Sequence, residues 1–146
     1  MINQSATERR HQTNKLIREL LEERREVWTK YCSLAGMQPY GPDQPLETLV
    51  QQFCQILIDY VSLGHFGVYQ RIVDGTERRL KIIELAEQSY PRIAEATDAA
   101  VEFNDKYERL LGEQLRRNLA RDLSVLGEKL ATRFELEDGL IETMTA

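Results

Sequence analysis

The chain closes with a stretch that decides the fold, residues 115–144, which read LRRNLARDLSVLGEKLATRFELEDGLIETM. Its apolar side chains recur every three or four positions, at Leu115, Leu119, Leu123, Leu126, Leu130, Phe134, Ile141 and Met144. This spacing lines one face of an α-helix. Because no segment with the period-two pattern of a strand competes with it anywhere in the chain, the sequence predicts an all-α protein.

The beginning of the chain predicts another long helix. Ser5-Ala6-Thr7-Glu8 has the form of a capping box, so a helix should follow it to about Ala35 and stop at Gly36. Its expected core stripe is Ile17, Leu20, Val27, Trp28, Tyr31 and Ala35. Arg24 interrupts this stripe, and two interpretations stay open: its side chain reaches out to solvent, or it forms a buried ion pair.

A proline-rich loop over residues 37–45 separates this helix from the second one. The second helix should begin near Pro45, with Asp43 as its possible cap, and end at Asp74-Gly75. Gly64 and Gly67 are positions where it can weaken or kink. Its expected core face is Leu46, Leu49, Val50, Phe53, Leu57, Val61, Val68 and Ile72.

Between the second and the last helix, Thr76 is a possible cap for a short helical stretch, and Pro91 begins or bends a third long helix. That helix should bury Ile93, Thr97, Ala100, Val101, Asn104 and Tyr107. Gly112 is the expected break before the last helix. These elements predict an antiparallel up-and-down four-helix bundle with long helices and a short broken helical segment between the second and third, as a single domain over residues 1–146.

The composition restricts the classes of partner. The formal charge is −5, and residues 41–75 carry four acidic side chains against one basic one, so a basic partner is favoured over nucleic acid. The polar residues 1–15 lack the apolar core of a signal peptide, and no apolar run has the length of a membrane span, so we expect a cytoplasmic protein without membrane contact. Cys32 and Cys54 are expected to be small buried side chains rather than a disulfide.

The sequence contains no recognisable catalytic or metal site. A di-metal helical bundle needs two Glu-x-x-His pairs, and only Glu8 and His11 form one, since Ser62 stands three residues before His65. Cys54 lies 11 residues from His65 on the same predicted helix, roughly 16 Å away at the rise of an α-helix, which is too far for a nucleophile and its base. We therefore expect no enzyme, no metal and no cofactor.

The second helix has a second face that does not turn uniformly polar. Phe66 falls nearly opposite the core residue Leu57, and Asp59, Ser62, His65 and Tyr69 lie around it. Aromatic side chains among a few polar groups are typical of protein-binding hot spots. These five residues (Asp59, Ser62, His65, Phe66 and Tyr69) are therefore predicted to bind a partner, unless the helix is central and both of its faces are internal.

The last helix carries charges inside its apolar stripe. Arg133 and Glu137 are expected to form an i,i+4 pair at the end of the bundle, a contact of small energy if exposed. Glu135 and Asp138 point elsewhere and extend an acidic rim. Glu137 and Asp138 are accordingly further candidates for partner binding.

Two segments of the sequence also resemble a known family. They are Phe53–Gln55 with Asp59–Phe66, Tyr69 and Arg71-Ile72, and Arg133–Asp138 with Leu140-Ile141. These segments look like the signature of the regulator-of-sigma-D family (Rsd/AlgQ). The resemblance implies a helical-bundle anti-sigma factor that binds the primary sigma factor of RNA polymerase, chiefly its C-terminal promoter-recognition domain. Such binding competes with core polymerase and with promoter contact.

The expected assembly is a monomer that binds sigma one to one, without direct contact to nucleic acid. Two alternatives belong to other classes of protein. One is a helical adaptor that binds another regulatory or metabolic signalling protein, and the other is a helical metalloenzyme.

Overall fold

The computed structural model describes residues 2–65 and 80–145, with the side chains of residues 2–7 and 9 also left out of the description. These residues form α1 (Ile2–Ala35), α2 (Leu46–Leu63), α4 (Leu80–Tyr107), α5 (Gly112–Arg117) and α6 (Leu119–Thr145). No strand occurs within the described part of the chain. The all-α class is therefore confirmed.

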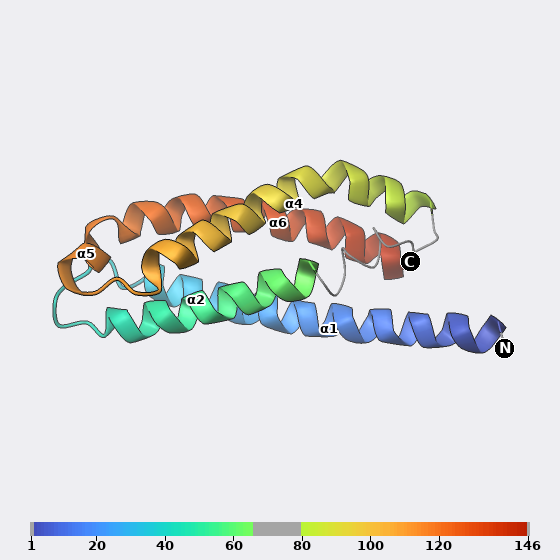
Figure 1. Ribbon diagram of the computed structural model, residues 1–146, viewed down its shortest axis with the longest axis horizontal. Coiled ribbons are helices and arrows are strands. Elements are labelled where there is room, and N and C mark those ends of the chain that lie inside the picture. The colour runs from blue at the N-terminus through green and yellow to red at the C-terminus, as the bar shows by residue number, and fades with distance from the viewer. Residues whose placement is uncertain (1, 66–79, 146) are drawn as a thin grey trace.

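The long helices pack around one core. α1 packs against α2 and α6, and α4 also packs against both of these helices, so that α2 and α6 are not close neighbours. Figure 1 shows the four long helices side by side, with both chain ends at the same end of the molecule and α1 running out beyond the rest. The predicted up-and-down connectivity depends in part on residues 66–79, and it stays a prediction. Val68, Ile72 and the possible cap Thr76 lie outside the described residues.

The boundaries of α1 correct one prediction and confirm another. The helix begins at Ile2, so Ser5 and Glu8 lie inside it and the expected capping box does not start it. The helix ends at Ala35 as predicted, and the Gly36 amide donates to the Cys32 carbonyl over 2.9 Å. Along its core stripe Leu20 and Val27 are buried, but the side chain of Trp28 is 41% exposed.

Side-chain hydrogen bonds hold the loop before α2, and Gln44 makes two of them. Gln44 donates through Nε2 to the Met37 carbonyl over 3.0 Å and accepts from the Gly41 amide over 2.9 Å. The expected cap at Asp43 is wrong, because Pro45 occupies the N-cap position and no side chain caps the helix. The core face of α2 is largely as predicted: Leu46, Val50, Phe53, Leu57 and Val61 are buried.

Pro91 lies within α4, which continues unbroken from Leu80 to Tyr107, so the described part of the short segment expected before Pro91 is the first part of this long helix and not a separate element. Val101 was expected in the core but is 40% exposed, while its neighbour Ala100 is fully buried. Gly112 has a backbone φ of 59°, a conformation that favours glycine, and it starts the short helix α5. Its amide donates to Glu47 Oε1 over 3.0 Å, which fixes this turn to the start of α2.

Gly127 of α6 lies directly against a side chain of α1. The Tyr31 hydroxyl donates to the Leu123 carbonyl over 2.8 Å, so the phenol lies directly on the backbone of α6. A Cβ atom at Gly127 would overlap this hydroxyl group. The absence of a side chain at position 127 therefore leaves the space that the Tyr31 phenol occupies.

Candidate partner-binding surfaces

Asp59 is an exposed carboxylate on α2, as the binding prediction requires. It accepts a 3.0 Å hydrogen bond from Gln55 Nε2, one turn earlier on the same helix. No bridge to another described helix is found for it. Asp59 is thus available to a partner at the surface.

Glu23 of α1 faces this carboxylate. Burial raises the pKa of Glu23 above its usual range, and the nearby negative charges of Asp59, Glu26 and Glu19 raise it further. One oxygen of Glu23, Oε2, is buried and has no hydrogen-bond partner among the described residues. The seam between α1 and α2 is therefore acidic, and its carboxylates repel one another.

The other candidates predicted for the second helix divide into two groups. Ser62 is half-buried on α2, and His65, two residues after the end of α2, is exposed. Phe66 and Tyr69, the two proposed aromatic anchors, lie outside the described residues. We define the Asp59 surface as Glu23, Asp59, Ser62 and His65.

Glu137 is not a surface residue, which corrects the expectation for the last helix. It is only 1% exposed, and it accepts a hydrogen bond from the Tyr60 hydroxyl of α2. Arg133, fully buried on α6, places Nε 3.5 Å from Glu137 Oε2 and donates from Nη1 to Thr97 Oγ1 of α4 over 2.6 Å. The predicted exposed pair at the end of the bundle is thus a buried cluster that joins α2, α4 and α6.

The reason for this burial is the position of both charges within the apolar stripe of α6. A buried charge is tolerated when it is paired and hydrogen-bonded, and each member of the cluster meets that condition. The guanidinium of Arg133 also lies 5.0 Å from the centre of the Tyr60 ring. A partner has no direct access to Glu137 in this conformation, so its role in binding would be to support the surface from below.

Arg24 connects this cluster to solvent. Its Nη1 lies 2.8 Å from Asp138 Oδ1 and 3.7 Å from Glu137 Oε1. Each of the two interpretations left open by the sequence holds in part, because Arg24 is 19% exposed and pairs both with the buried Glu137 and with the exposed Asp138. Asp138 itself is 53% exposed, so it meets solvent while holding Arg24.

The long helices follow one another around the core in the order α1, α2, α4, α6. This order separates Asp138 from Asp59. α1 lies between α2 and α6, and Glu23 faces Asp59 on one side of it while Arg24 faces Asp138 on the other. Of the described candidates, Asp59 and Asp138 therefore lie on opposite sides of α1 and do not form one continuous patch.

A second surface lies on the α6 side of α1. It is a hollow of about 500 Å³, which we call the Trp28 groove, and it is lined by Leu21, Arg24, Arg25, Trp28, Phe134 and Asp138. Reasoning from sequence missed it because Trp28 was assigned to the core. The available signal was its place beside Arg24, at the margin of the stripe where a helix face turns toward solvent.

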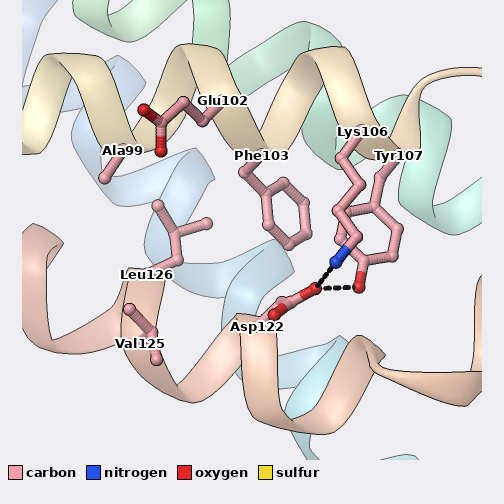
Figure 2. A pocket seen from close by; sticks show the side chains of 8 residues that line it. All are labelled: Ala99, Glu102, Phe103, Lys106, Tyr107, Asp122, Val125 and Leu126. Atoms are coloured by element: carbon pink, nitrogen blue, oxygen red, sulfur yellow. Dashed lines mark hydrogen bonds and ion pairs between the residues drawn. The ribbon is translucent and has the colours of Figure 1, made fainter.

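A third hollow, of about 250 Å³, lies between α4 and α6 near α5 (Figure 2). Lys106 Nζ lies 2.6 Å from Asp122 Oδ2, and the Tyr107 hydroxyl donates to the same oxygen. Although burial acts to raise the pKa of Asp122, hydrogen bonds from Lys106 and Tyr107 lower it overall. The pKa of Tyr107 is raised mainly by burial and, to a smaller extent, by the hydrogen bond to Asp122. Lys106, Tyr107 and Asp122 are hydrogen-bonded to one another, so this hollow gives no indication of a ligand site.

Comparison with known proteins identifies the family. The family model described as "Regulator of RNA polymerase sigma(70) subunit, Rsd/AlgQ" matches residues 1–145. The chain belongs to the Rsd/AlgQ family. The resemblance noted in the sequence is thereby confirmed.

Curated members of the Rsd/AlgQ family are similar along nearly their whole length. A regulator of sigma D from Yersinia enterocolitica is 34% identical over 143 residues, covering 95% of this chain and 86% of the relative. One from Enterobacter sp. is 35% identical over 150 residues, covering 97% and 88%. One from Salmonella paratyphi A is 33% identical over 147 residues, covering 97% and 90%.

Cysteine and metal chemistry add no site to this Rsd/AlgQ member within the described residues. Burial raises the pKa of the Cys54 thiol to about 12, which leaves it an inert thiol at neutral pH. Cys32 is exposed, contrary to the expectation that both cysteines are buried. Residues 2–65 and 80–145 hold no group of three or more side chains arranged to bind a metal. No helix within these ranges is apolar and long enough to cross a membrane.

Proposed function

We propose that this chain is an anti-sigma factor that binds the primary sigma factor of bacterial RNA polymerase, chiefly its C-terminal promoter-recognition domain. Binding sequesters sigma from core polymerase and from the promoter and so regulates transcription. Membership of the Rsd/AlgQ family supports the class of partner. The observation that carries the surface assignment is Asp59, an exposed carboxylate in an acidic seam.

The chemistry of the Asp59 surface suits a protein that reads DNA. Such a domain presents lysine and arginine side chains to phosphates. Asp59 can pair with one of these cations, and the buried, unsatisfied oxygen of Glu23 gains a partner if a second cation enters the seam. Each cation that the protein occupies in this way is withheld from the promoter.

The remaining predicted residues fill subordinate roles in the proposal. Ser62 and His65 supply hydrogen-bonding groups next to Asp59, and Phe66 and Tyr69 supply aromatic anchors. Glu137 acts only through Tyr60, the neighbour of Asp59, which it holds from below. The mechanism is occlusion at equilibrium, with a single bundle domain binding one sigma molecule and no chemical step.

The test is binding of the Asp59→Asn variant to the purified C-terminal domain of the primary sigma factor, measured by isothermal titration calorimetry. We expect binding to weaken by about tenfold or more, as loss of one charged pair at an interface does. Asp105→Asn removes an exposed carboxylate from α4 near the α5 end and serves as the matched control. Equal affinities of the two variants would reject the Asp59 surface.

Binding of the unaltered chain tests the broader proposal. If it does not bind the sigma domain at all, the alternative of a helical adaptor for another regulatory protein takes precedence. Phe66→Ala examines the aromatic anchor, with an expected loss of more than about 1 kcal/mol of binding free energy while helicity by circular dichroism stays unchanged.

A further inference from the structure

Trp28 is a rigid aromatic side chain at the surface. Its indole is 41% exposed, and it stacks on Tyr31 with ring centres 5.0 Å apart and planes within 9°. Phe134 of α6 meets it edge to face at 5.8 Å. Held from two sides, the ring has little conformational entropy to lose when another surface covers it, which is the property of an interface anchor.

The rims of the Trp28 groove carry opposite charges. Arg25, on the α1 rim, is exposed and forms no ion pair with any residue in the described ranges. Asp138, on the α6 rim, uses Oδ1 to hold Arg24 and is otherwise open to solvent. Arg24 and Asp138 form an ion pair with each other, so the exposed cation left over in the groove is Arg25. The groove thus offers this cation and, on the opposite rim, the exposed side of the Asp138 carboxylate.

We propose that the Trp28 groove is covered by a second copy of this chain in an isologous pair. A two-fold axis through the hollow between Arg25 and Asp138 places each guanidinium over the carboxylate of the other copy. A surface that carries both charges in this arrangement is complementary to itself. A chain with a formal charge of −5 needs such cross-pairs to overcome the repulsion between copies.

This pairing is independent of sigma binding. The Asp59 surface lies on the other side of α1, so each copy keeps it free for one sigma molecule. The pairing replaces the monomer expected from the sequence for the free chain, while one sigma per chain is retained.

The primary test is the mass of the full chain by sedimentation equilibrium from about 1 to 200 µM, because association depends on protomer concentration. We expect a dimer at the upper end, accompanied by a blue shift in the fluorescence of Trp28, the single tryptophan of the chain. Trp28→Ala should raise the dimer dissociation constant at least about tenfold. Val125→Ala, which trims an exposed apolar side chain of α6 outside the groove, should leave it unchanged.

Charge reversal tests the geometry. Arg25→Glu and Asp138→Lys should each dissociate the dimer, because each variant alone sets like charges against one another. An equimolar mixture should associate again, since both cross-pairs are then attractive. Asp138→Asn, which removes the carboxylate without adding a cation beside Arg24, should also weaken the pair.

Three outcomes would overturn the pairing. The first is an unaltered chain that stays monomeric throughout the concentration range. The second is a mixture of the reversal variants that associates no better than either alone. The third is a monomeric chain whose binding to sigma is lost in Trp28→Ala, which would assign the groove to sigma instead.

Discussion

The cluster around Glu137 and the cluster around Asp122 contain the same three kinds of group. In each, a tyrosine hydroxyl donates to a carboxylate that also meets a cation. They differ in burial: Arg133 and Glu137 are 0% and 1% exposed, whereas Lys106 and Asp122 are 46% and 21% exposed. From this comparison we expect that solvent access, rather than the identity of the partners, decides how much unfolding free energy is lost when one partner is removed.

The largest effect is expected for Glu137→Ala. It leaves the buried guanidinium of Arg133 without its carboxylate, which costs about 3–5 kcal/mol of unfolding free energy. Urea unfolding followed by circular dichroism measures the loss. Glu135→Ala changes an exposed glutamate on the same helix and should alter stability by less than about 0.5 kcal/mol. Similar losses for the two variants would contradict the importance of burial.

A smaller effect is expected for Asp122→Asn, about 1–2 kcal/mol, because water can solvate part of the cluster that remains. The pKa of Asp122 is lowered in the folded protein, so its contribution is present above the unfolded value near 3.8 and is lost as pH falls through the folded value. The stability difference between the variant and the unaltered protein should therefore be constant above about pH 5 and shrink as the pH falls below it. A difference independent of pH would show that the carboxylate charge does not matter here.

The smallest effect, of opposite sign, is expected for Glu23→Gln. The raised pKa of Glu23 means that its ionised form is disfavoured by folding, so its stabilising contribution is present at acid pH and is lost as pH rises. Removing the charge should raise Tm at pH 7 by about 1–2 °C in differential scanning calorimetry. Glu22→Gln, an exposed neighbour, is the control. A fall in Tm would mean that the acidic seam is already stabilised by a group outside the described residues.

Sequence periodicity predicted the helices better than it predicted burial at their edges. The stripe from Leu46 to Val61 and the stop at Gly36 were correct because they depend on local spacing and turn chemistry. Trp28 and Val101 were misplaced because periodicity gives the direction of an apolar face but not its width. Which neighbouring helix covers the margin of a stripe is decided by tertiary packing.

The candidate site shows the same division. The exposure of Asp59 followed from its angular position on α2. The burial of Glu137 did not, because its partner Tyr60 lies 77 residues away in the sequence and on another helix. From sequence alone, a charged residue within an apolar stripe is predicted to be exposed, because the partners that would allow its burial are not known. The placement of Asp138 apart from Asp59 likewise required the ring order of the helices.

The missing side chain at Gly127 has a consequence for the distant indole. The Tyr31 hydroxyl lies against this glycine, and the Tyr31 ring stacks on Trp28. The position of the α6 backbone therefore helps to fix the position of the indole at the surface. A single methyl group at position 127 would overlap the hydroxyl end of Tyr31, so the phenol that stacks on Trp28 would have to shift. The placement of the indole on the outer side of α1 therefore depends in part on the lack of a Cβ atom inside the bundle at position 127.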